Sequence, residues 1–315
     1  MTLPPRKTLV IGSRGSQLAL WQARWVQTQL TILGRESRIE IIHTTGDKIT
    51  DVSLAKVGGK GLFTKEIEEA LLACTIDIAV HSLKDMPAEL PQGLTIAAIP
   101  LREDPRDALI GCRFADLRAN ACVGTSSLRR SAQLQSLRPD LRIEPLRGNV
   151  DTRLRKLDAG HYDAIVLAAA GLHRLGLGDR IAEILDPGIM CPAAGQGALA
   201  IETRSQHGFA RRMCSTLDHT PTRIAVTAER ALLGALGGGC QVPIGSYAEV
   251  REDKVHLRAV VISPDGRTVL KFERAAALKQ AAMTGRAVAA RLLNMGAREI
   301  LDAIYGAPVL TPGGA

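Results

Sequence analysis

Aromatic residues are scarce in this sequence, with four Phe, three Tyr and two Trp among 315 residues. Such a chain offers few rings on which nucleic-acid bases could stack. No apolar run approaches the ~20 residues of a membrane-spanning helix, and no phosphate-binding loop of the Walker type occurs. None of the six cysteines belongs to a Cys-x-x-Cys pair or to a Cys/His cluster with zinc spacing. Nucleic-acid, membrane and metal partners are therefore disfavoured.

The cysteines indicate where the protein works, and the charge balance indicates the kind of partner that it binds. The N-terminal residues lack the apolar segment of a secretory signal. The thiols are scattered along the chain at Cys74, Cys112, Cys122, Cys191, Cys214 and Cys240. Unpatterned thiols are typical of a reduced protein, so we expect a cytoplasmic location. Lys and Arg total 40 against 32 Asp and Glu, and the resulting net charge of +8 favours an anionic partner.

The first two thirds of the chain alternate between short apolar runs and amphipathic segments. The predicted strands are Thr8–Gly12, Arg38–His43, Ile76–His81, Ala121–Gly124, Arg142–Leu146 and Asp163–Leu167. The predicted helices are 17–33, Phe63–Cys74, Leu128–Leu137 and Val150–Ala159. This alternation indicates a parallel sheet with helices on both faces. The openings IGSRGSQLAL and VGTSSLRRSAQL resemble each other, so we predict two similar α/β lobes, with crossovers at 100–107 and near 190–200.

The last third has a different pattern. A helix at 229–236 runs into three glycines and Cys240, and strand-like segments follow at 244–250, 255–262 and 268–272. An alanine-rich stretch predicts a final helix over roughly 276–304. Consecutive strands followed by a helix indicate a small α+β domain.

Basic and hydroxyl residues follow several predicted strands. In parallel α/β sheets, ligands bind at the carboxyl ends of the strands, where helix N-termini present N–H groups to anions. Three such junctions carry matching side chains: Arg14 and Ser16; Thr125 and Ser127 with Arg129 and Arg130; and Arg147 with Arg153. Arginine forks bind carboxylates in two-point geometry. The alternative is that these arginines lie on solvated helix faces.

Three further features are candidates for a catalytic or binding role, and each also has a purely structural interpretation. Lys56 and Lys60 lie among three glycines, which predicts a basic flap over an anion or an ordinary surface loop. Asp85 follows a buried strand and is a candidate for acid–base work or a turn stabiliser, while His81 is expected to pack at the strand end. Cys240 follows three glycines and could be a nucleophile, a covalent attachment point or a buried filler.

The same residues carry a resemblance to a known family. The motifs, in order, are SRGSQLALWQA, HTTGDK, KVGGKGLFTKEIE, DIAVHSLKDMP, REDPRDALI, VGTSSLRRSAQL, LRGNVDTRL, AAAGLHRLG, CPAAGQGALAIE and GGGCQVPIG. In this order and over nearly the whole chain, the sequence resembles porphobilinogen deaminases, which are also called hydroxymethylbilane synthases. The C-terminal tail is unmatched.

The resemblance implies a transferase of tetrapyrrole and haem biosynthesis that condenses four porphobilinogen molecules head to tail and releases ammonia. It implies a covalently attached dipyrromethane cofactor, no metal and a monomer. The implied domains are residues 1–100 with 200–219, residues 101–199, and residues 220–315, the first two similar to periplasmic binding proteins.

The resemblance also implies roles for individual residues. Asp85 would be catalytic, and Cys240 would hold the cofactor through a thioether. The cofactor-binding residues would be Lys84, Arg129, Arg130, Ser127, Ser82 and Thr125. The substrate-binding residues would be Arg14, Ser16, Arg147, Arg153 and Arg174. Lys56 and Lys60 would lie in the active-site loop.

Two other classes share some of these features. A solute-binding protein would have two lobes, but it needs an export signal and has no use for a Gly-Gly-Gly-Cys loop. A nucleic-acid binder would explain the charge, but it would show steep salt dependence and more aromatic residues. Neither class predicts a covalent pyrrole adduct.

Overall fold

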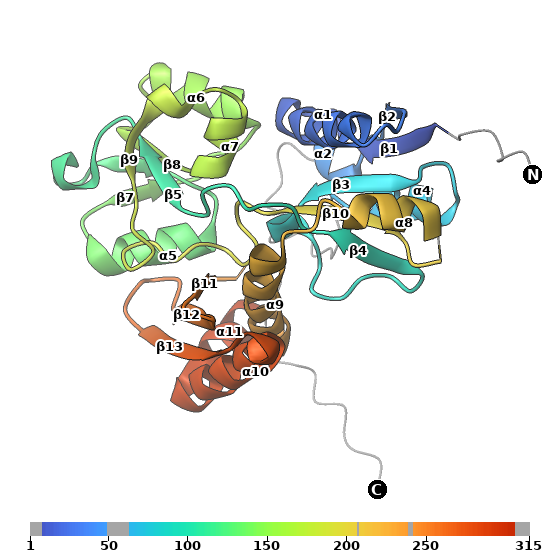
Figure 1. Ribbon diagram of the computed structural model, residues 1–315. Helices are drawn as coiled ribbons and strands as arrows, with labels where there is room; N and C mark the ends of the chain where they lie inside the picture. Colours follow the sequence, from blue (N-terminus) through green and yellow to red (C-terminus); the bar gives the residue numbers. More distant parts are fainter. Residues whose placement is uncertain (1–7, 49–62, 207, 239–241, 306–315) are drawn as a thin grey trace, which may run out of the picture.

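The structure of the chain is a computed structural model that describes residues 8–48, 63–206, 208–238 and 242–305 (Figure 1). These residues form two five-stranded sheets and one three-stranded sheet, each packed with helices of its own. We call the parts built on the two larger sheets lobe 1 and lobe 2. Short 3₁₀ helices lie at Leu83–Asp85, Phe114–Asp116, Gly178–Arg180 and Leu278–Gln280.

Lobe 1 is built on a sheet in which four strands are parallel and one runs the other way. The order across the sheet is β2 (Ser37–Ile41), β1 (Leu9–Ser13), β3 (Ile78–Ser82), β10 (Leu199–Arg204) and β4 (Leu94–Ala98). Strand β10 is antiparallel to both of its neighbours. The helices of this lobe are α1 (Gln17–Ile32), α2 (Thr45–Lys48), α4 (Lys65–Leu72) and α8 (Gly208–Ser215). Apolar residues of α1 and α8 cover one face and those of α4 the other.

Lobe 2 repeats this arrangement. The order across its sheet is β7 (Arg142–Glu144), β6 (Cys122–Gly124), β8 (Ala164–Ala168), β5 (Asp107–Ile110) and β9 (Ile181–Ile184). Strand β5 is antiparallel to both of its neighbours. The helices are α5 (Leu128–Leu137) on one face and α6 (Val150–Asp158) with α7 (Ala169–Arg174) on the other.

The shared strand order confirms the prediction of two similar lobes. The prediction of a parallel sheet holds for four strands of each lobe, and the remaining strand is antiparallel to them. In each lobe the antiparallel strand occupies the same place, fourth in the order. Strand β5 is the first strand after the chain leaves β4 of lobe 1, and β10 is the first after it leaves β9 of lobe 2. The direction of these strands follows from the crossovers, because each enters its sheet from the opposite lobe.

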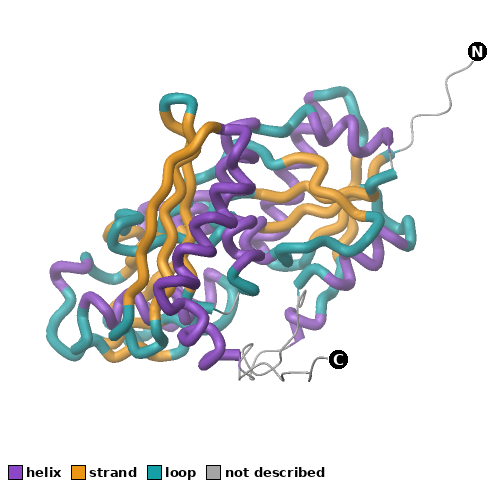
Figure 2. The backbone as a smooth tube through the Cα atoms, turned by 90° about the horizontal axis from the view of Figure 1, so that it is seen from below, coloured by secondary structure: helices purple, strands orange, loops and turns teal. Residues whose placement is uncertain are grey.

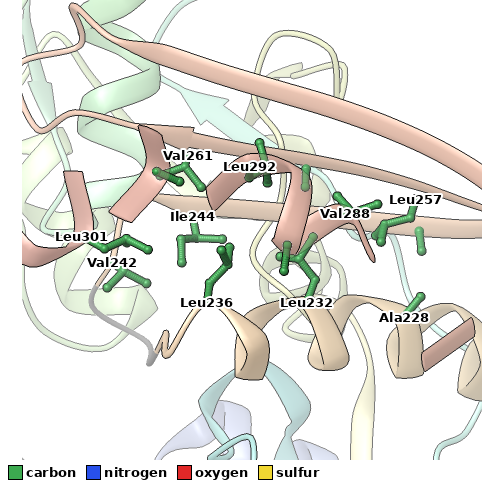
Figure 3. Close-up of a cluster of buried hydrophobic side chains, with 14 of the residues drawn as sticks. Ala228, Leu232, Leu236, Val242, Ile244, Leu257, Val261, Val288, Leu292 and Leu301 are labelled. Atoms are coloured by element: carbon green, nitrogen blue, oxygen red, sulfur yellow. The ribbon is translucent and has the colours of Figure 1, made fainter. Parts of the chain in front are cut away.

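The C-terminal part is an antiparallel sheet covered by helices (Figure 2). Its strands are β11 (Ile244–Arg251), β12 (Lys254–Ile262) and β13 (Val269–Ala277), in that order. Helices α9 (Thr220–Ala235) and α10 (Ala281–Leu292) pack on it and on each other. Leu232 of α9 and Val288 of α10 are fully buried between them (Figure 3). Burying such a side chain fully contributes about 1.5–3 kcal/mol, so α9 is held firmly on this sheet.

The predicted final helix over 276–304 is wrong at its start and in its middle. Residues up to Ala277 belong to β13, because they pair with β12 over its whole length. This pairing overrides the helical propensity of alanine. The helix begins at Ala281 and is interrupted by a π-helical segment, Leu293–Ala297, in which Gly296 has φ of +102°. It resumes as α11 (Arg298–Tyr305).

Candidate functional site

The carboxyl ends of β1 and β3 form one side of a pocket in lobe 1. The two strands are adjacent and parallel, so the residues that follow them emerge at the same edge of the sheet. Arg14 and Ser16 follow β1, and Ser82 and Asp85 end and follow β3. All four line the pocket, together with Gln22 of α1. The structure therefore brings together four residues that the sequence singled out at two separate strand ends.

Ser16 begins helix α1 and still has a donor for a ligand. Its Oγ accepts a hydrogen bond from the Ala19 backbone N–H at 3.3 Å, as in an ordinary N-cap. A hydroxyl that accepts in this way keeps its own hydrogen for donation to another group. Beside it, the Arg14 guanidinium lies 4.3 Å from the centre of the Phe63 ring. Stacking on an aromatic ring holds a guanidinium in place without neutralising its charge.

Asp85 is presented by a single 3₁₀ turn, Leu83–Asp85, directly after β3. Leu83 is buried and anchors this turn, and its backbone N–H donates to the Ala198 carbonyl at 3.0 Å. Ser82 is fixed by the buried Gln22, whose Nε2 donates to Ser82 Oγ at 2.9 Å. Gln22 was not identified from the sequence, since a glutamine within an amphipathic helix carries no local signal of such a contact.

Lys84 lies between charges from both lobes. The pKa of this amine is lowered to about 8, chiefly by burial; Arg130 and Arg129 add to the lowering, and Asp85 and Asp107 oppose it. The arginines and Asp107 belong to lobe 2, whereas Lys84 and Asp85 belong to lobe 1. The charged groups of the two lobes are thus within electrostatic range of one another.

Arg129 and Arg130 form a buried ion-pair network on Asp107. Arg129 Nη1 and Arg130 Nη2 each donate to the Asp107 carboxylate at 2.7 Å. The three side chains are 5%, 6% and 0% exposed in the same order. Gln196 Nε2 adds a hydrogen bond to Asp107 Oδ1 at 2.9 Å. Although burial alone would raise the pKa of Asp107, the two guanidinium groups hold it well below its usual range.

This network predicts a large effect of Asp107→Asn on stability. The substitution leaves two buried guanidinium groups without their counter-ion, and breaking a buried pair in this way costs about 3–5 kcal/mol. We expect a fall of this size in the free energy of unfolding, measured by urea titration. Asp151→Asn is the control, because Asp151 and Arg155 form an exposed pair on α6 and such pairs contribute little. Equal effects of the two variants would refute a structural role for the network.

The remaining predicted residues of lobe 2 lie at the ends of β6 and β7. Thr125 Oγ1 accepts from the Ser127 backbone N–H at 3.2 Å, which shapes the turn into α5. Arg153 donates from Nε to the Gly148 carbonyl at 2.7 Å, close behind Arg147. Burial lowers the pKa of Arg153 to about 10, with Arg130 adding to this effect and Asp85 opposing it. Arg153 therefore stays charged at neutral pH and senses Asp85 of the other lobe.

Arg174 lies where the lobes meet. Its Nη2 donates to the Gly197 carbonyl at 2.6 Å, and its guanidinium lies 5.9 Å from the centre of the Trp21 ring of α1. Burial lowers its pKa to about 10. His81, as predicted, packs at the strand end, with Nε2 3.1 Å from the Glu202 carboxylate inside lobe 1.

Three predicted residues lie outside the described part of the chain: Lys56, Lys60 and Cys240. The structure describes the segments that flank Cys240. Gly237 follows α9 with φ of +67°, a conformation that favours glycine. Val242, on the other side, is buried in the core of the C-terminal part (Figure 3). Leu236, just before Gly237, belongs to the same core, so the described residues on both sides of 239–241 are anchored in it.

Two properties of the described residues bear on other functions. No group of three or more His, Cys, Asp or Glu side chains there is arranged to hold a metal ion. Within the same ranges, no helix is long and apolar enough to cross a membrane.

Comparisons with known proteins give consistent matches. Residues 9–212 match the family model described as porphobilinogen deaminase, dipyromethane cofactor binding domain, and residues 223–294 match the C-terminal domain of the same family. The chain is 52% identical over 306 residues to a porphobilinogen deaminase of Syntrophobacter fumaroxidans, covering 96% of this chain and 99% of that protein. It is 50% identical over 303 residues to one of Geotalea uraniireducens, covering 95% of each.

The solved structures that match are more distant. The methionine-binding protein MetQ matches with a TM-score of 0.44 and 13% identity, covering 67% of this chain and 89% of that one. A periplasmic substrate-binding protein of an ABC transporter from Coxiella burnetii matches with a TM-score of 0.42 and 12% identity, covering 71% and 97%. At these scores neither match adds to what the strand order already describes.

Proposed function

The chain belongs to the porphobilinogen deaminase family, and from this premise we propose that it joins four porphobilinogen molecules head to tail into hydroxymethylbilane, a linear tetrapyrrole, with release of ammonia. The observation that supports this most directly is the pocket of lobe 1, in which Asp85 lies with Arg14 and Ser16. Among the described residues that line this pocket, Asp85 is the one carboxylate, and it lies with the Arg14 cation and the Ser16 hydroxyl. Such a set suits an acidic substrate that becomes cationic as it reacts.

The basic residues match the charge of the substrate. Each porphobilinogen carries an acetate and a propionate, so every added unit brings two carboxylates to the site. One ion pair at about 4 Å contributes about 4 kcal/mol at an effective dielectric near 20, before the cost of desolvation is subtracted. We propose that Arg14, Ser16, Arg147, Arg153 and Arg174 bind substrate. Arg174 would act from the contact between the lobes, where it also holds the Gly197 carbonyl.

Asp85 has the position for the chemical step. When ammonia leaves the aminomethyl group of the substrate, the remaining pyrrole is an electron-poor cation. A carboxylate beside the pyrrole N–H stabilises this cation electrostatically and can accept a proton as the new carbon–carbon bond is completed. Lys84, adjacent in sequence, supplies a positive charge that attracts the carboxylates of the cofactor and of the growing chain, and so binds them apart from the Asp85 oxygens.

The residues present also fit a dipyrromethane cofactor. Two cations, Arg129 and Arg130, and two anions, Asp85 and Asp107, act electrostatically on Lys84. Arg153 is a further cation close enough to Asp85 to feel its charge. Four positive charges face two negative ones, and an acidic ligand would restore the balance. Ser82, Lys84, Thr125, Ser127, Arg129 and Arg130 would hold the cofactor, the two arginines partly through their field because Asp107 occupies their nitrogens. When bound, the cofactor supplies the pyrrole end on which the chain grows.

Cys240 is the best candidate for the attachment thiol. Burial raises the pKa of four of the five described cysteines, to about 12 for Cys191 and Cys214. Thiols in such surroundings are poor nucleophiles. Cys240, Lys56 and Lys60 enter this proposal from the family pattern alone, the two lysines as residues of a loop over the substrate.

We also propose three coarser features. The domains would be residues 1–100 with 200–219, residues 101–199 and residues 220–315, in support of which β10 joins the sheet of lobe 1. The chain would act as a monomer. It would work in the cytoplasm, in line with the five described cysteines, all of which are free thiols.

Ammonia release from porphobilinogen as a function of pH tests this function. We expect four ammonia molecules per tetrapyrrole. We also expect the KM to rise by about 10- to 30-fold from pH 7 to 9.5. Lys84 loses its charge above its pKa of about 8, and the acidic oligomer at the site then loses a charge-assisted hydrogen bond of about 1.5–3 kcal/mol. Lys84→Arg stays charged and should abolish the rise. No ammonia release would reject the function, and an equal rise in Lys84→Arg would reject the role of Lys84.

A further inference from the structure

Helix α9 of the C-terminal part holds the turn that carries Asp85. Arg230, in its third turn, donates from Nη2 to the Pro87 carbonyl at 2.7 Å and to the Ala88 carbonyl at 3.1 Å. These carbonyls follow Asp85 by two and three residues. One turn further along α9, a Cβ at Gly234 would lie 3.6 Å from Ala88 Cβ, which is ordinary contact. The helix thus holds the chain as it leaves the Asp85 turn.

Helix α9 also supports Leu83, the residue at which the Asp85 turn begins. Glu229 is fully buried, and its Oε2 accepts from the Gly195 backbone N–H at 2.6 Å. Gly195 has φ of +74°, and a Cβ there would come within 2.9 Å of Leu83 Cγ. Leu83 is the first residue of the Asp85 turn. Val226 of α9 packs in one buried cluster with Leu83 and Met86.

Glu229 is itself fixed by groups from two directions. Arg102, on the crossover between the lobes, donates to Glu229 Oε1 at 2.7 Å and to Oε2 at 3.1 Å. The Ala248 backbone N–H of β11 donates to Oε1 at 2.7 Å. The Glu229 carboxylate therefore accepts hydrogen bonds from the crossover, from the C-terminal sheet and from Gly195, which lies against Leu83.

We propose that Arg230 is a positioning residue for the reaction, which holds the Asp85 turn in place against α9. This inference rests on the proposed function, because it takes Asp85 as the reacting carboxylate. Three contacts restrict the turn. The Arg230 guanidinium binds the two carbonyls that follow it, Val226 packs on Leu83 and Met86, and Gly195 lies against Leu83. A displacement of about 1 Å at a reacting group can cost ~10²-fold in rate.

The test compares two arginines of the same helix in the full-length, cofactor-bearing protein. Arg223 also lies on α9, and it donates to Asp218 at 2.7 Å and to the Ile96 and Ala97 carbonyls of β4 rather than to the residues that follow Asp85. Arg230→Gln should lower kcat for ammonia release by about 10- to 100-fold with little change in KM and with the cofactor still attached by intact mass. Arg230→Lys, which keeps one cationic donor, should lie between it and the wild type. Arg223→Gln should keep kcat within about twofold of the wild type.

Thermal unfolding of the same variants separates positioning from folding. Both glutamine variants should lose stability, because each removes hydrogen bonds to two carbonyls, and Arg223→Gln also removes the ion pair with Asp218. A kcat of Arg230→Gln within about twofold of the wild type would overturn the proposal, as would equal loss of kcat in Arg223→Gln. A higher KM at unchanged kcat would also overturn it, since it would indicate a role in binding. A wild type without turnover or adduct rejects the proposed function instead.

Discussion

Asp85→Asn is expected to keep the cofactor attached and to lose turnover by about 10²–10⁴-fold, the range that a positioned acid–base group contributes. Asparagine has nearly the same shape as aspartate, so the 3₁₀ turn and its Leu83 anchor should survive. What disappears is the negative charge beside the cationic intermediate, and the group that could take its proton. Initial rates of ammonia release, with intact mass to verify the adduct, measure both parts of this expectation.

The chain offers a matched control for this substitution. Asp116 is the third residue of another 3₁₀ turn, Phe114–Asp116, just as Asp85 is the third residue of Leu83–Asp85. Asp116→Asn repeats the chemical change at an equivalent backbone position outside the pocket, and its rate should match the wild type. A rate for Asp85→Asn near that of the control would show that Asp85 is misassigned.

Cys240→Ser should produce a chain without the adduct and without measurable turnover. A hydroxyl is a far weaker nucleophile than a thiolate toward a soft, cationic carbon, so a serine should not capture the pyrrole electrophile. Intact mass should give the mass of the polypeptide alone, and ammonia release should fall to background. Both readouts are needed, because ammonia release alone does not distinguish a chain without the adduct from a chain that carries the adduct and does not turn over.

Cys74→Ser is the control for the loss of a thiol. Cys74 is an exposed, free cysteine after α4 in lobe 1. This variant should keep the adduct and full activity. If Cys240→Ser kept the adduct, or if Cys74→Ser lost it, the attachment site would lie elsewhere than Cys240.

Local patterns predicted the strand ends because the information there is local. A strand such as Ile78–Ser82, followed by Lys84, Asp85 and a proline, is visible in ten consecutive residues. Helix α5 was predicted with the bounds that it has, Leu128–Leu137, because the alternation of short apolar runs and helical segments is itself local. Similar openings after β1 and β6 were enough to predict two related lobes.

The contacts that organise the site are not local, and the sequence could not show them. Arg129 and Asp107 are 22 residues apart, and Arg230 and Pro87 are 143 apart. Asp107 is the first residue of the otherwise apolar strand β5. It becomes the counter-ion of Arg129 and Arg130 only when α5 packs beside that strand. For the same reason, Arg129 and Arg130 were expected at a ligand, and the structure shows their nitrogens bound to Asp107. Strands β4, β5, β9 and β10 were also missed, since short apolar runs do not reveal their partners.

The most direct test of the central claim, that a basic site in which Asp85 lies builds an acidic oligomer anchored at Cys240, is the intact mass of the wild-type protein before and after addition of porphobilinogen. We predict that the purified protein is heavier than its polypeptide by two linked pyrrole units. Addition of substrate should then give a ladder of species, each heavier by one further unit, that ends at four. A protein with the mass of the bare polypeptide, unchanged by substrate, would contradict the account.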